Sequence, residues 1–174
     1  MPVPPPALVL VGVESTGKTT LARRLAAATG RVFVPEVARG WLEARGGRYE
    51  ESDLLTLARL QNDAELDARR RWGAVVVDTD LVVLRVWSEA RYGRCADEIL
   101  AMLAARGPAS YLLPVPDLPW QADPLRETPA LKARHALHAR YVRLLAELGH
   151  PWAEVHGEGQ ARWANARAAL RGLN

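Results

Sequence analysis

The sequence predicts an α/β fold in which a parallel sheet of about five strands lies between two layers of helices. The first observation is that short apolar runs alternate along the chain with longer segments rich in alanine, arginine and leucine. The second is that these apolar runs are continuous, which is typical of strands that are buried on both faces. Helices that connect parallel strands pack onto the faces of the sheet, so this order of elements predicts three layers.

The expected strands and helices alternate along nearly the whole chain. The strands cover residues 7–11, 31–35, 74–78, 109–113 and 152–156, and the first of them reads Ala-Leu-Val-Leu-Val. The helices cover residues 18–29, 37–45, 52–72, 81–92, 95–106, 129–148 and 158–171. A length of 174 residues with 49% hydrophobic residues is ordinary for one globular domain, so we expect residues 1–174 to form a single domain.

One segment interrupts this alternation. Residues 114–129 contain five prolines, which exclude a regular helix and a central strand. A loop of this length inside a compact domain is usually functional, so we expect a lid over the site. The alternative is a rigid surface connection.

The charge pattern favours a small anionic ligand. The formal net charge is +3, and the only lysines among 23 basic residues are Lys18 and Lys132. No basic run with interleaved aromatic residues occurs, so we expect no nucleic acid as a partner. Cys95 is the only cysteine and the first apolar run is too short to span a membrane or to form a signal sequence. We therefore expect a cytoplasmic protein without a membrane partner.

The strongest motif lies between the first strand and the first helix. Residues 12–19 read Gly-Val-Glu-Ser-Thr-Gly-Lys-Thr, which matches the phosphate-binding loop G-x-x-x-x-G-K-[ST]. Its glycines allow the backbone to approach an anion, Lys18 reaches the β- and γ-phosphates as a compact charge, and the Thr19 hydroxyl coordinates Mg²⁺. The motif predicts a three-layer P-loop NTPase fold that uses ATP and Mg²⁺. The expected ATP-binding residues are Gly12, Glu14, Ser15, Thr16, Gly17, Lys18, Thr19 and Thr20.

Acidic residues follow two of the expected strands, where open parallel sheets bind their ligands. Asp78 ends the run Val-Val-Val-Asp and is a candidate for holding Mg²⁺ directly or through water. The alternative is a helix N-cap, a role that Thr79 or Asp80 could fill instead. Glu36 is a candidate general base, although a carboxylate here could also bind a sugar diol or stabilise the first turn of the next helix. Arg39, one turn later, could pair with Glu36 or contact the substrate.

Several motifs, taken in order, resemble a known family. They are Gly-Val-Glu-Ser-Thr-Gly-Lys-Thr-Thr-Leu at residues 12–21, Pro-Glu-Val-Ala-Arg at 35–39, Gln61, Asp-Thr-Asp at 78–80, and Asp-Leu-Pro-Trp-Gln-Ala-Asp-Pro-Leu-Arg at 117–126. Together they resemble the ribosylnicotinamide kinase domain of the NadR-like family. The resemblance covers nearly the whole chain, and its proline-rich segment is the most specific part.

The resemblance implies ATP-dependent phosphorylation of nicotinamide riboside at its 5′-hydroxyl, which gives nicotinamide mononucleotide. It also implies four catalytic residues that act on the ATP phosphates, the metal or the acceptor hydroxyl, one of them an arginine of the lid: Lys18, Glu36, Asp78 and Arg126. It implies a nucleoside site formed by Glu36, Arg39, Gln61, Asp80 and Trp120. Thr19 and Asp78 would hold the metal, and Gly157 would lie beside the adenine unless it is only part of a turn.

The sequence departs from the family in two ways. Family members often carry an N-terminal adenylyltransferase domain, but six residues precede the first strand, so we expect that activity to be absent from this chain. The aromatic neighbours that stack on the substrate base in some relatives are missing, and Trp41, Trp87 or Trp120 could replace them. The alternatives are a kinase for another nucleoside or a small alcohol, and a regulator that binds ATP or NAD without catalysis.

Overall fold

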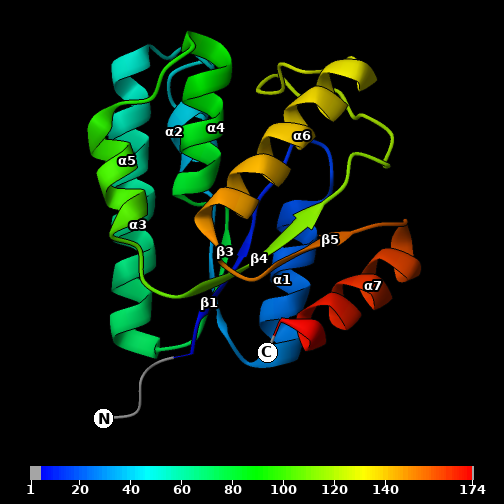
Figure 1. Ribbon diagram of the computed structural model, residues 1–174. Coiled ribbons are helices and arrows are strands. Elements are labelled where there is room, and N and C mark those ends of the chain that lie inside the picture. Colours follow the sequence, from blue (N-terminus) through cyan, green and yellow to red (C-terminus); the bar gives the residue numbers. More distant parts are fainter. Residues whose placement is uncertain (1–4, 174) are drawn as a thin grey trace.

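The computed structural model describes residues 5–173, and these form one five-stranded parallel sheet with seven helices (Figure 1). The strands lie in the order β2-β3-β1-β4-β5. Their bounds are β1 (Ala7–Leu10), β2 (Val32–Val34), β3 (Val75–Asp78), β4 (Ala109–Pro114) and β5 (Trp152–Val155). The predicted three-layer α/β fold of the P-loop NTPase type is confirmed.

The helices occupy the predicted segments, and every predicted boundary lies within two residues of the observed one. The helices are α1 (Lys18–Thr29), α2 (Val37–Glu43), α3 (Glu51–Trp72), α4 (Leu81–Tyr92), α5 (Asp97–Ala104), α6 (Leu131–Leu148) and α7 (Gly159–Gly172). Between residues 5 and 173, no helix combines the length and the apolar character needed to cross a membrane.

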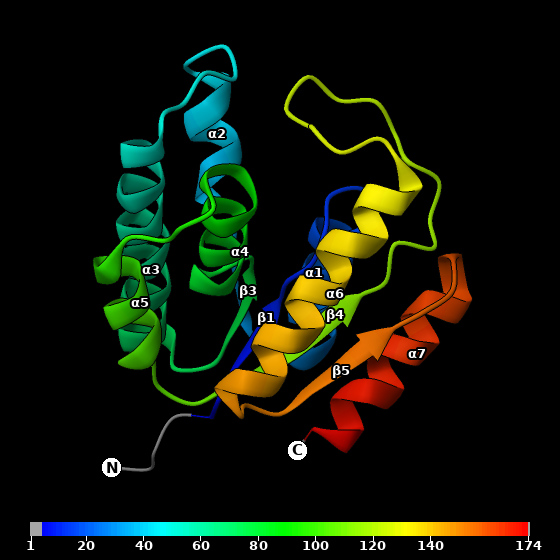
Figure 2. The same ribbon diagram turned by 45° about the horizontal axis from the view of Figure 1, so that its top comes forward.

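Side chains from both faces of the sheet are buried. Val9, Val77 and Tyr111 pack on one face with α3, α4, α5 and α6, whereas Leu10 and Leu112 pack on the other with α1 and α7. Figures 1 and 2 show these two helical layers on either side of the sheet. Every residue of β1, β3 and β4 is buried, so these strands do not alternate between apolar and polar positions, which explains their mainly apolar runs.

A buried ionic cluster fastens α3 and α4 to the sheet. The Arg106 guanidinium lies 2.8 Å from the Glu65 carboxylate and 3.4 Å from that of Asp80. Asp80 also accepts the Tyr111 hydroxyl at 2.9 Å and the Val82 N–H at 2.9 Å, so its side chain caps α4. The carboxylate of Asp80 therefore has a structural role, since it caps α4 and pairs with Arg106.

The Arg106→Ala variant should be strongly destabilised, because it leaves the buried carboxylates of Glu65 and Asp80 without their cation. We expect a loss of about 3–5 kcal/mol in the free energy of unfolding, measured by urea denaturation. Arg71→Ala is the matched control, since it removes an exposed ion pair with Asp67 on α3 and should change stability by less than about 1 kcal/mol. Equal losses in the two variants would contradict the structural importance of the cluster.

Candidate active site

The phosphate loop joins β1 to α1 and depends on two glycines. Gly12 has a φ of +131°, and a Cβ placed there would lie 3.1 Å from the Leu113 side chain and 3.4 Å from the Pro114 carbonyl. Gly17 has a φ of +76° and immediately precedes the first residue of α1. A side chain at Gly12 would therefore be strained and crowded, and its absence lets the loop pass close to β4 while turning toward the helix.

Lys18 lies across the phosphate loop. Its Nζ donates to the Val13 carbonyl at 2.7 Å. Burial lowers the pKa of Lys18 from its usual value, although the carboxylates of Glu36 and Asp78 act in the opposite direction. A desolvated ammonium that faces two acidic side chains is placed to bind a polyphosphate.

Asp78 ends β3 next to β1, in register with Leu10. Its side chain is buried, and neither of its carboxylate oxygens has a hydrogen-bond partner. Burial raises its pKa, and the nearby Thr19 hydroxyl and Lys18 ammonium act against that shift. Unsatisfied carboxylate oxygens close to the Thr19 hydroxyl suit a divalent cation that keeps most of its ligands as water and phosphate oxygens. Residues 5–173 contain no cluster of three or more His, Cys, Asp or Glu side chains suited to a metal.

Glu36 stands between β2 and α2 at the N-cap position of α2, but its side chain makes no capping hydrogen bond. The buried Gln61 holds the backbone on both sides of it: its Oε1 accepts the Val37 N–H at 2.9 Å and its Nε2 donates to the Pro35 carbonyl at 3.3 Å. Burial raises the pKa of Glu36, with Lys18 opposing. The backbone at Glu36 is therefore fixed, and burial lets its carboxylate take up a proton above the ordinary pKa range of glutamate.

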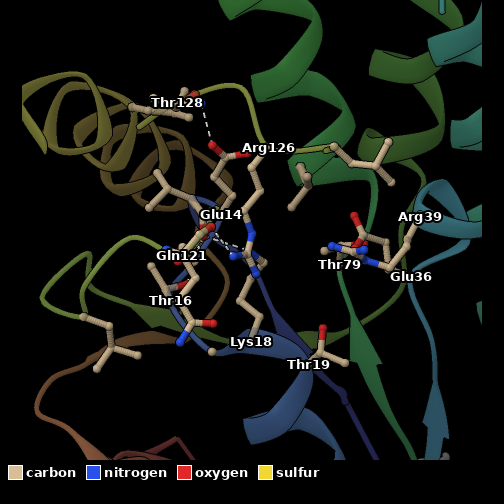
Figure 3. A pocket seen from close by; sticks show the side chains of 18 of the residues that line it. Glu14, Thr16, Lys18, Thr19, Glu36, Arg39, Thr79, Gln121, Arg126 and Thr128 are labelled. Atoms are coloured by element: carbon tan, nitrogen blue, oxygen red, sulfur yellow. Dashed lines mark hydrogen bonds between the residues drawn. The ribbon is translucent and has the colours of Figure 1, made fainter. Parts of the chain in front are cut away.

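A cavity of about 890 Å³ is lined by the phosphate loop and also by apolar and aromatic side chains such as Val83, Val86 and Trp87. Lys18, Thr19, Glu36, Arg39 and Arg126 line it together. Figure 3 shows the Arg126 side chain extending toward Lys18, with Glu36 and Arg39 across the cavity. Predicted functional residues from three separate segments of the chain, around residues 12–20, 36–39 and 126, thus line one cavity.

The far end of the cavity has an aromatic wall. Tyr49 and Trp87 meet edge to face with ring centroids 4.9 Å apart, and the Trp87 Nε1–H donates to the Tyr49 hydroxyl at 3.0 Å. Of the three tryptophans considered from the sequence, Trp87 lines the cavity. Trp41 lies beneath the Arg45 guanidinium at 3.7 Å, and Trp120 directs its Nε1 toward Glu14. Tyr49 lies between α2 and α3, outside any motif.

Residues 115–130 connect β4 to α6 without regular secondary structure and are attached to both sides of the cavity. On one side the Gln121 N–H donates to Ser15 Oγ at 2.9 Å. On the other side Asp123 lies 3.0 Å from the Arg39 guanidinium. In Figure 2 this yellow-green segment and α2 lie at the same end of the sheet. This segment therefore carries Arg126 to the cavity wall.

Arg162 on α7 was not singled out by the sequence, although it organises one edge of the site. Its buried guanidinium donates to the carbonyls of Thr16 and Val115 at 2.9 Å each, and to Asp117 at 2.7 Å. Asp117 also accepts the Gly157 N–H at 2.7 Å. Arg162 therefore connects the loop after β5 to the phosphate loop.

Five predicted site residues do not line the cavity: Asp78, Asp80, Gln61, Trp120 and Gly157. Asp78 lies at the end of β3, and Trp120 directs its Nε1 toward Glu14. Asp80 was expected to meet a substrate, but it is buried and occupied by Tyr111, Arg106 and the cap of α4. Gln61 braces the backbone around Glu36. Gly157 faces Asp117, and the cavity is lined instead by its neighbours in the same turn.

Thr79, between the two aspartates, does line the cavity and has a φ of 66°. This conformation is strained for a β-branched residue by about 1–3 kcal/mol. The strained turn separates Asp78, at the end of the strand, from Asp80, at the start of α4.

Comparisons with known proteins agree with this geometry. A family model described as an AAA domain matches residues 7–162, whereas no curated protein matches the sequence. Two solved structures of NadR protein, one in complex with NR and one with NAD and AMP-PNP, are similar over 97% of this chain, with TM-scores of 0.70 and 0.74 and identities of 26% and 25%. This chain spans about half of those chains, 51% and 49%. Thymidylate kinase from Ehrlichia chaffeensis shares the fold, with a TM-score of 0.69, 12% identity, and coverage of 98% of this chain and 100% of that one.

The Asp78→Asn variant should be more stable than the wild type at pH 7. Because burial raises the pKa of Asp78, the folded state binds the carboxyl proton of Asp78 more tightly than the unfolded state does. The wild type therefore loses stability as pH rises through the folded pKa of Asp78, whereas the neutral asparagine side chain of the variant does not titrate. We expect an advantage at pH 7 that shrinks toward pH 4, measured by urea unfolding at several pH values. A variant that is no more stable at pH 7 than at pH 4, relative to wild type, would contradict the desolvation of Asp78.

Proposed function

The chain belongs to the AAA domain family, and from that premise we propose that it is an ATP-dependent kinase that phosphorylates nicotinamide riboside at the 5′-hydroxyl. One observation carries the proposal: a single cavity connects the phosphate loop, a buried carboxylate and an aromatic wall. Its volume of about 890 Å³ is large enough for a nucleotide and a small acceptor together. The likeness to NadR in complex with NR supports this choice of acceptor.

In the proposed reaction the phosphate loop and Lys18 bind the β- and γ-phosphates of ATP. Thr19 and Asp78 would hold Mg²⁺, which when bound neutralises phosphate charge. Glu36 accepts the proton of the acceptor hydroxyl. The oxygen of that hydroxyl then bonds to the γ-phosphorus of ATP. At the same time the bond between the γ-phosphorus and the β–γ bridging oxygen breaks, which releases ADP. Arg126 stabilises the charge on the transferring group.

The acceptor fits the opposite half of the cavity. Tyr49 and Trp87 line the cavity with their rings at 70° to one another, and either electron-rich ring can stack on the pyridinium ring of nicotinamide riboside, which is a flat cation. Glu36, near Lys18, would then meet the ribose hydroxyls between the base and the phosphates. We further propose that residues 1–174 act as one kinase domain, with residues 115–130 as the lid that excludes water.

The proposal predicts that the protein with ATP and Mg²⁺ converts nicotinamide riboside to its 5′-phosphate faster than it phosphorylates adenosine, uridine, cytidine, thymidine or glycerol. The measurement is product formation by liquid chromatography and mass spectrometry. Turnover of another acceptor but not of nicotinamide riboside would show that the acceptor is wrong. Tight ATP binding without transfer to any acceptor would favour a non-catalytic nucleotide sensor.

The Glu36→Gln variant should lose about 10²–10⁴-fold in kcat, because it can no longer accept the proton, whereas its KM for ATP should change little. In the wild type, kcat should fall on acidification at a pH above the ordinary titration range of glutamate, since burial raises the pKa of Glu36. Glu147→Gln, at an exposed site on α6, is the control and should keep wild-type rates. Equal activity of the two variants would exclude Glu36 as the base.

A further inference from the structure

We propose that Glu14 is a positioning residue that holds Arg126 over the phosphate loop by anchoring the backbone just after it. The proposal rests on the proposed function, because Arg126 matters only if a phosphoryl group is transferred. Glu14 occupies the third position of the phosphate loop, which places a carboxylate in a site that binds anions. Its own charge would repel the phosphates, so its presence there needs an explanation.

The carboxylate of Glu14 is turned toward residues 120–128. It accepts the Thr128 N–H at 2.5 Å and the Glu127 N–H at 3.1 Å, with the Trp120 Nε1–H at 3.5 Å. Figure 3 shows the bond from Thr128 and the Arg126 side chain passing beside Glu14. Hydrogen bonds from N–H groups to a carboxylate are shorter and stronger than neutral ones. Glu14 thus satisfies two consecutive backbone donors that follow Arg126.

The neighbouring Ser15 holds the segment of residues 120–128 at its other end, through Gln121. Its Oγ accepts the Gln121 N–H at 2.9 Å, and the Gln121 carbonyl in turn accepts Arg126 Nη1 at 2.5 Å. The main chain after Arg126 is therefore held by Glu14, and its guanidinium is held through Ser15. Both attachments arise from side chains of the phosphate loop, so the position of Arg126 follows the position of that loop.

This arrangement predicts which kinetic constant depends on Glu14. The backbone of the loop binds the nucleotide and does not need the Glu14 side chain, whereas Arg126 acts on the charge that develops during transfer. Loss of Glu14 should therefore lower kcat through a misplaced Arg126 and leave ATP binding nearly unchanged. A carboxylate that only repelled phosphate would behave differently, because its removal would tighten ATP binding and leave kcat unchanged.

The test compares Glu14→Ala and Glu14→Gln with wild type and with Asp67→Asn, which removes an exposed carboxylate on α3 far from the cavity. Amide hydrogen exchange at residues 127 and 128, measured without nucleotide, should be at least about 10-fold faster in Glu14→Ala and unchanged in Asp67→Asn. In kinetic assays, kcat should fall about 10- to 100-fold in Glu14→Ala and less in Glu14→Gln, with KM for ATP within about 3-fold of wild type.

A double variant decides whether Glu14 acts through Arg126. In an Arg126→Ala background, Glu14→Ala should cause no further loss of kcat. Independent, multiplicative losses would overturn the proposal, and so would a change in KM for ATP in either direction with unchanged kcat. Unchanged amide exchange overturns the anchoring even if the protein has no kinase activity, whereas a wild-type protein that phosphorylates no acceptor would refute only the proposed function.

Discussion

The backbone of the phosphate loop must approach an anion closely, and the other parts of the site depend on this. The loop can do so only if the surrounding elements hold it in one conformation. Gly12 passes so near β4 that a side chain would meet Leu113 and Pro114. Two buried arginines also hold carbonyls of the loop: Arg134 donates to the Ser15 carbonyl and Arg162 to that of Thr16. Backbone N–H groups can face a ligand only because the carbonyls of the same loop are held elsewhere.

The same loop also organises the parts that must act on a bound nucleotide. Arg162 links it through Asp117 to the turn after β5, and Glu14 and Ser15 link it to the segment that carries Arg126. Across the cavity, Arg39 holds the same segment through Asp123. The loop is therefore the common reference for both edges of the cavity, and its ion pairs and hydrogen bonds favour a preorganised site.

Much of this could be predicted from the sequence, but side chains that act at a distance along the chain could not. Continuous apolar runs and the glycine–lysine motif were enough for the fold, the phosphate loop and Asp78 at a strand end. For Asp80 the sequence left a ligand contact and the cap of the next helix open; in the structure Asp80 caps α4, and the left-handed Thr79 separates it from Asp78. The contact of Arg162 with Thr16 joins residues 146 positions apart, and in a chain rich in arginine no local pattern distinguishes it.

If one cavity holds the nucleotide and the acceptor in line, a crystal structure with a non-hydrolysable ATP analogue, Mg²⁺ and nicotinamide riboside will show both there. We expect the γ-phosphate between Lys18 and Arg126, the 5′-hydroxyl within hydrogen-bond distance of Glu36, and the pyridine ring against Tyr49 and Trp87. An acceptor bound outside this cavity, or one whose 5′-hydroxyl points away from the γ-phosphate, would contradict this arrangement.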